Sequence, residues 1–400
     1  MSERRFDNRS NLSFRQRTNS QYGSGYYRSR RSNTLRENNR NYGSSSDYDR
    51  SGNRVSRHGR IGSGYQRHSS HREYSLQVHN RIVTRINFPV HVNTSIITDI
   101  LQDLESDHIQ SLTSGVAIAL LHKIGKCRCD SKIKSFDIRN RVMSKIIYSF
   151  PKTFSNTHIG NSCYGIRNMS KVTLTKTSLI YALASKISRS DAVLDAQAIG
   201  NACYGLQGVK EIGDSAAVGA LVSALAVKIS RSDAVLNAQA IGNACYGLQG
   251  VKEIGDSAAV GALVSALSVK ISRSDAVLDA QAIGNACYGL QGVKEIGDSA
   301  AVGALVSALS VKISRSDAVL DAQAIGNACY GLQGVKEIGD SAAVGALVSA
   351  LSVKISRSDA VLDAQHIGNA CYGLQGVKEI GDSDAVGALV SALAVKISRS

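Results

Sequence analysis

The stretch QAIGNACYGLQG at residues 197–208 decides the fold, because the chain repeats it. It returns unchanged three times, at 239–250, 281–292 and 323–334. It returns with one change as QHIGNACYGLQG at 365–376, and in a related form as HIGNSCYGIR at 158–167. Around this stretch, a period of 42 residues runs five times from Ser188 with almost no drift. Internal repeats of this length are typical of solenoids, in which each unit stacks on its neighbours.

Each unit reads as two helices. In the first copy, Asp195 is a good N-cap for a helix over 196–207, and Gly208 then supplies a left-handed C-terminal position. Asp214 or Ser215 caps a second helix that runs to about residue 229. The segment ISRSDAVL at 187–194 connects successive units, and no Pro lies inside any copy.

One face of each helix is apolar, as helical periodicity requires for packing. In the first copy these residues are Ile199, Ala202, Cys203, Leu206 and Val209, followed by Val218, Leu221, Val222, Leu225 and Ile229. A single unit has too little apolar surface to offset the entropy of ordering its backbone. Stacked neighbours must therefore bury the rest. We predict an all-α fold, an α-solenoid of stacked antiparallel helix pairs.

The chain divides into three predicted regions. Residues 1–75 hold sixteen Arg, no Lys and six acidic residues, with seven interleaved Tyr, and we expect a disordered basic arm. Residues 76–187 are predicted to form an N-terminal cap with degenerate helical repeats: a short strand over 81–92, two helices within 93–125 and a third over 138–150. Residues 188–400 are the five near-identical repeats, which carry a net charge of −4.

The cysteines favour a reducing compartment. Six of the eight occupy one slot of the repeat, which is typical of a small buried hydrophobe. Stacked repeats usually hold such residues too far apart for disulfides. Cys127 and Cys129 form a lone CxC pair without further ligands nearby, which is weak support for zinc. We expect an intracellular protein, and the sequence leaves open an organelle, a bacterial cytoplasm or a secreted bacterial effector.

The first helix of each repeat carries a second row of residues, opposite its apolar face. Gln, Asn and Tyr stand there at positions i, i+4 and i+7. The fifteen residues are Gln197, Asn201, Tyr204, Gln239, Asn243, Tyr246, Gln281, Asn285, Tyr288, Gln323, Asn327, Tyr330, Gln365, Asn369 and Tyr372. Amides can pair with base edges and Tyr can stack on bases, so these are candidate RNA-binding residues. The alternative is structural: Gln and Asn would tie neighbouring repeats, and Tyr would pack between them.

The stretch DAQAIGNACYGLQGV at 195–209, followed by VGALVSALAVKIS at 218–230, resembles the octotricopeptide repeat. The matching positions of the first helix are Gln197, Ala198, Ile199, Asn201, Ala202, Cys203, Tyr204, Gly205 and Leu206. The resemblance covers 188–400 and extends faintly over 110–187. It implies an RNA-binding α-solenoid, a type of protein that often acts on organelle transcripts.

These observations favour a non-enzymatic protein that binds single-stranded RNA, with the Arg- and Tyr-rich arm adding affinity for any sequence. The alternative is a protein-interaction scaffold, such as a bacterial effector that docks a host protein. No catalytic constellation, cofactor motif or metal-ligand spacing is visible, and no apolar run is long enough to span a bilayer. Val386, Leu389, Val390 and Leu393 of the last repeat lack a following unit in the sequence, so we also expect either self-association through this end or a missing C-terminal segment.

Overall fold

The computed structural model describes residues 112–127, 136–167, 173–210, 214–252, 256–293, 299–335, 341–377 and 382–400, with the single residues 212, 254, 296 and 338. These residues form fourteen α-helices and four short 3-10 helices, and none of them is in a strand. The predicted all-α solenoid is confirmed. The arm over 1–75, the strand over 81–92 and the first helix expected after residue 93 lie outside the described residues.

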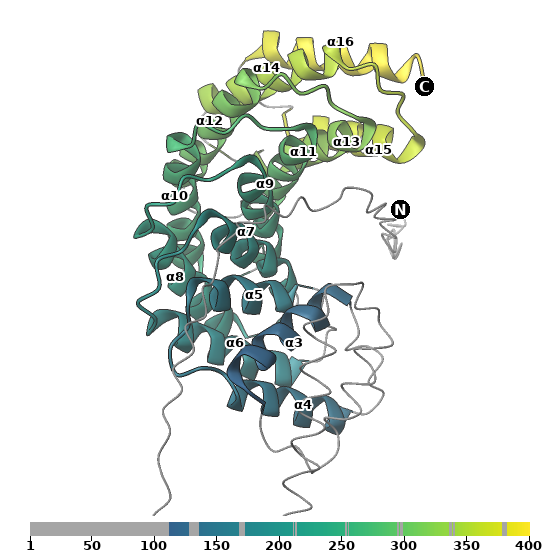
Figure 1. Cartoon of the computed structure of the whole chain (residues 1–400). Helices are drawn as coiled ribbons and strands as arrows, with labels where there is room; N and C mark the ends of the chain where they lie inside the picture. The colour runs from purple at the N-terminus through teal and green to yellow at the C-terminus, as the bar shows by residue number, and fades with distance from the viewer. Residues whose placement is uncertain are drawn as a thin grey trace, which may run out of the picture. The chain divides into compact units, whose positions relative to one another are not determined.

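The helices alternate between two layers (Figure 1). The first-layer helices are α3 (Ser114–Cys127), α5 (Asn156–Ile166), α7 (Ala196–Gly205), α9 (Ala238–Gly247), α11 (Ala280–Gly289), α13 (Ala322–Gly331) and α15 (Ala364–Leu374). The second-layer helices are α4 (Phe136–Tyr148), α6 (Thr173–Ser188), α8 (Ser215–Ser230), α10 (Ser257–Arg273), α12 (Ser299–Arg315), α14 (Ser341–Arg357) and α16 (Ser383–Ile397). The stack from α5 to α16 bends, and the first-layer helices lie on the inner side of the bend.

The predicted caps begin the helices. The Asp195 carboxylate accepts a hydrogen bond from the backbone N–H of Ala198 at 2.7 Å, and Asp214 does the same for Ala217 at 2.9 Å. In the second repeat, Asn237 replaces Asp and caps α9 equally well, at 2.8 Å from the N–H of Ala240. The one-letter difference between these copies therefore preserves the local structure, because both side chains offer an acceptor oxygen.

The end of the first helix differs from the prediction. The α-helix stops at Gly205, and residues Leu206–Val209 continue as a 3-10 helix. Gly208 has no left-handed backbone, so the expected C-terminal glycine cap is wrong. A Cβ on Gly208 would lie 1.8 Å from the carbonyl oxygen of Ile166 in the preceding repeat. Glycine stands here because two backbones touch.

Gly205 has the same role. A Cβ at this position would lie 1.9 Å from the carbonyl oxygen of Cys163, and the equivalent Gly247, Gly289, Gly331 and Gly373 meet the preceding repeat at the same distance. Each first-layer helix packs extensively on the first-layer helix of the next repeat and only slightly on its own partner helix. The same holds in the second layer. A single repeat therefore has little internal contact to stabilise it.

Buried polar ties join the second layer to the connecting segments. Lys228 is buried, and its ammonium donates to the carbonyl oxygen of Ser190, which precedes the same repeat's first helix. Ser232, also buried, donates to the carbonyl of Leu194 at 2.6 Å. Both bonds recur along the array, with Lys270 and Ser274 as the next pair. A buried cation is costly unless it is bonded, so each lysine fixes the position of a connecting segment.

The cysteines follow the prediction with one exception. Cys163, Cys203, Cys245, Cys287 and Cys329 are free and buried, and burial raises the pKa of Cys245 to about 12. Cys371 occupies the same slot in the last repeat but is exposed, because among the described residues α15 packs extensively on α13 alone. On α16, Leu389 and Leu393 are buried, because α16 packs on α14 of the preceding repeat, whereas Val390 is 45% exposed. Within the described residues, no helix is long and apolar enough to cross a membrane.

Candidate functional site

The fifteen residues singled out in the sequence form three parallel rows along the first-layer helices, and we call this surface the inner face. The Gln residues of the first row are exposed in all five repeats. The Asn residues are half-buried, as are Tyr204, Tyr246, Tyr288 and Tyr330. Tyr372 of the last repeat is 44% exposed. The residues are thus brought together as the helical spacing predicts.

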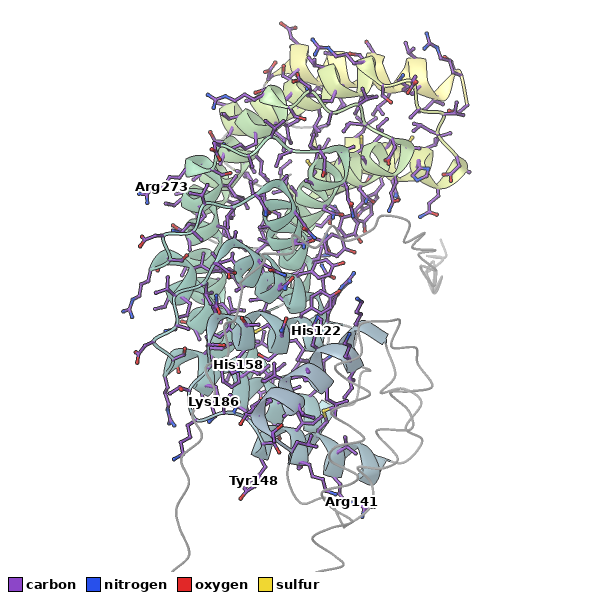
Figure 2. All side chains as sticks on the ribbon, viewed as in Figure 1. His122, Arg141, Tyr148, His158, Lys186 and Arg273 are labelled. Atoms are coloured by element: carbon purple, nitrogen blue, oxygen red, sulfur yellow. The ribbon has the colours of Figure 1, made fainter. Side chains whose placement is uncertain are left out.

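The Tyr row is a continuous ladder of rings. Ring centroids are 5.6 Å apart for Tyr164 and Tyr204, and the distances in the next four steps are 5.4, 5.3, 5.3 and 5.1 Å. The rings become nearly parallel in the middle of the array, at 19° between Tyr246 and Tyr288. His122 of α3 adds one more ring, 4.8 Å from Tyr164, and Figure 2 labels it.

The ladder excludes one expected contact with bases. Inserting a base between two rings needs about 7 Å, twice the stacking rise of about 3.4 Å, and the rings are no more than 5.6 Å apart. The ring faces therefore stabilise the array, as the structural alternative predicted for Tyr. Burial raises the pKa of Tyr204 to about 12, so its hydroxyl stays protonated at neutral pH. A ligand on the inner face meets ring edges and hydroxyls.

The Asn row has unused hydrogen-bonding capacity. Among the described residues, no hydrogen bond to another residue is formed by the side-chain amides of Asn201, Asn243, Asn285, Asn327 and Asn369, although they are half-buried. The same is true of the Gln row that starts with Gln197. The tie between repeats that the structural alternative assigned to these residues is absent from the described structure. Each amide keeps donors and an acceptor for a ligand.

A different Gln makes the tie. Gln207 lies in the 3-10 helix after α7, and its side-chain N–H donates to the backbone carbonyl of Tyr246 in the next repeat. Gln249 and Gln291 bond Tyr288 and Tyr330 in the same way, each at 2.6 Å, and Gln333 bonds Tyr372. Sequence reasoning missed this row. The signal was the LQG that follows CYG in all five repeats, where two glycines allow the neighbouring backbone to come within reach.

Arg167 is a second residue that the sequence did not single out. It stands in the register of Gln207, after Tyr164, Gly165 and Ile166. Its guanidinium carbon lies 3.8 Å from the centroid of the Tyr204 ring and 5.9 Å from that of Tyr246. The inner face therefore starts with a cation on its Tyr ladder.

The described residues offer no metal site, since no group of three or more His, Cys, Asp or Glu side chains comes together in them. The inner face of the five repeats is polar but uncharged, because Gln, Asn and Tyr fill it. Such a surface can exchange hydrogen bonds with the edges of flat polar groups. It cannot by itself neutralise a row of phosphates.

Comparison with known proteins leaves the family open. No protein-family model matches the sequence, and no curated protein matches it. Solved structures resemble the chain only loosely. An engineered protein is 17% identical over 85% of this chain and 91% of its own, with a TM-score of 0.39. Yeast Rmd9p, solved with a 16-nucleotide target RNA, is 8% identical over 81% of this chain and 84% of its own, with a TM-score of 0.17. At these scores the likeness carries no argument about function, and the chain is described as a helical-repeat protein on its own geometry.

Proposed function

We propose that this protein binds single-stranded RNA along its inner face and catalyses no reaction. The observation that carries the proposal is the row of half-buried Asn amides without protein partners, repeated in register from Asn201 to Asn369. Solvent reaches these amides, since none of their atoms is among the described side-chain N and O atoms that are buried without a partner, so a ligand can replace their water contacts. Base edges present the donors and acceptors that an amide can match.

The spacing of the repeats supports an unstacked strand. The Tyr ring centroids of neighbouring repeats are separated by 5.1–5.6 Å. Helices usually pack about 8–10 Å apart, so the bend brings the repeats closer on this side. A stacked strand rises about 3.4 Å per base, which is less than the separation of the repeats. Bases that each face one repeat would have to separate, as they do in sequence-specific recognition of single strands.

The near-identity of the five repeats indicates which RNA sequence they would prefer. Five first helices present the same Gln, Asn and Tyr, so they should prefer a run of like bases. Asn and Gln pair well with the adenine edge, which makes an adenine run the first candidate. The basic arm over 1–75 would add phosphate contacts without sequence preference. We place this activity in a reducing intracellular compartment.

The test is equilibrium binding of the full chain to single-stranded RNA homopolymers of equal length. Changing Asn201, Asn243, Asn285, Asn327 and Asn369 together to Ala should lower affinity and remove the preference among homopolymers. The matched control changes Ser223, Ser265, Ser307, Ser349 and Ser391 to Ala, which are exposed on the second layer once per repeat.

The control should bind as the wild type does. If the Asn variant keeps the wild-type preference among homopolymers, the Asn side chains of the inner face do not recognise the bases. Absence of RNA binding by the wild-type chain would refute the function itself and would favour the protein-interaction scaffold.

A further inference from the structure

Arg167 breaks the repeat at the position where Gln ties one unit to the next. At this position the Gln side-chain N–H donates to a Tyr carbonyl of the following repeat, as seen for Gln207, Gln249, Gln291 and Gln333. The equivalent partner for Arg167 would be the carbonyl of Tyr204, and no such bond is formed. The side chain lies over the Tyr204 ring instead, on the inner face.

This placement leaves the guanidinium free to bind an anion. Contact with the ring face orients the group, and an interaction with the Tyr204 hydroxyl engages part of its N–H donors, which leaves the other donors in the guanidinium plane available. No salt bridge joins Arg167 to a carboxylate among the described residues. The remaining donors of this planar group, which is held on an aromatic ring, match the geometry of a phosphate group.

The neighbouring charges have the same sign. Burial lowers the pKa of His122 to about 4, and the nearby charges of Lys123 and Lys126 of α3 add to this shift. His122 is the ladder ring next to Tyr164, so both lysines flank the same end of the ladder as Arg167. The described residues between 112 and 190 hold ten Lys and Arg but one acidic residue, Asp137. The five repeats carry a net charge of −4, so an anion is attracted to this end of the array.

We propose that Arg167, assisted by Lys123 and Lys126, forms a phosphate-binding site at the N-terminal end of the inner face. The inference rests on the proposed RNA binding, and it adds that the site holds one phosphate of the strand and fixes where the strand starts on the ladder. The bound group is either a terminal phosphate or a phosphodiester within the strand, and the experiment separates the two.

The most informative variant is Arg167→Gln, because it installs the residue that the five following repeats carry at this position. Its Gln can tie to the Tyr204 carbonyl, so the fold should be preserved, which circular dichroism and a thermal melt check. Binding is measured with one RNA sequence in three forms: 5′-phosphorylated, 3′-phosphorylated and without terminal phosphate. Arg167→Lys, which keeps the charge but loses the fork, is the control for simple electrostatics.

We expect R167Q to weaken binding about tenfold or more and to reduce the slope of log affinity against log salt by about 0.7, which corresponds to one phosphate. R167K should retain part of the affinity. A loss confined to one terminally phosphorylated RNA identifies a terminal phosphate, and an equal loss for all three identifies a phosphodiester. Wild-type affinity and slope in R167Q would overturn the inference while leaving RNA binding intact.

A second measurement keeps the inference testable if the wild-type chain binds no RNA. Inorganic phosphate is titrated against the wild type and R167Q, with chloride at equal ionic strength as the reference, and the melting temperature is followed. Phosphate should raise the melting temperature of the wild type more than that of R167Q. Equal shifts would overturn the phosphate site, whatever the outcome for RNA.

Discussion

Two rows of amide side chains run through the same repeats, and they have opposite surroundings. The row of Gln207, Gln249, Gln291 and Gln333 bonds the backbone of the next repeat. The row that starts with Asn201 lies less than two helical turns away and bonds no described residue. The repetition of a residue in every unit therefore does not reveal what that residue does. The partner within reach decides whether an amide holds the array together or remains available for a ligand.

The tied row depends on close backbone contact, so the largest expected effect comes from the glycines that permit it. Gly289→Ala places a Cβ 1.9 Å from the carbonyl oxygen of Cys245, and a backbone atom cannot rotate away. We expect a loss of about 3 kcal/mol or more in the free energy of unfolding, measured by denaturant titration.

Gly368→Ala is the matched control, because this helical glycine of α15 has no atom within 4 Å of the added Cβ. It should leave stability unchanged or raise it by up to about 1 kcal/mol, since Ala favours helix. If the two variants are equally stable, the repeats do not touch as closely as described.

Removing the tie itself should have a smaller effect at each repeat. Changing Gln207, Gln249, Gln291 and Gln333 to Ala should cost about 0.5–1.5 kcal/mol per repeat, the net value of a hydrogen bond. Gln375→Ala is the control, because this Gln follows the last first-layer helix and is exposed. It should melt as the wild type does. A quadruple variant as stable as the control would show that the Gln bonds contribute nothing to the array.

The sequence predicted the fold well, because the fold depends on features that are local and repeated. Asp195 and Asp214 cap helices through their own chain neighbours, and the apolar positions of α7 and α8 follow from helical periodicity. Gly208 was misassigned because its reason lies in another repeat, at the carbonyl of Ile166. The same distance in sequence hid the partner of Gln207 and the ring under Arg167. Contacts between repeats cannot be derived from the periodicity of one repeat.

The candidate site was predicted in position but only partly in role. The three rows share a face, as spacings of i, i+4 and i+7 require. That the Tyr rings would stack on one another could not be read from one helix, since it depends on how far the array bends. The separation of 5.3 Å between Tyr246 and Tyr288 settles that their faces are occupied.

The Asn row does not contribute to the stability of the array, and this can be tested by comparing the thermal unfolding of two variants. Thermal unfolding is measured without ligand and under the same conditions for two variants. One is the quadruple Gln variant, and the other has Ala in place of Asn201, Asn243, Asn285, Asn327 and Asn369. We expect the Asn variant to unfold at or slightly above the wild-type temperature, because no protein partner is stranded and Ala favours helix, and we expect the Gln variant to unfold below it. A drop for the Asn variant as large as that for the Gln variant would contradict the account, since it would mean that the Asn residues hold the repeats together.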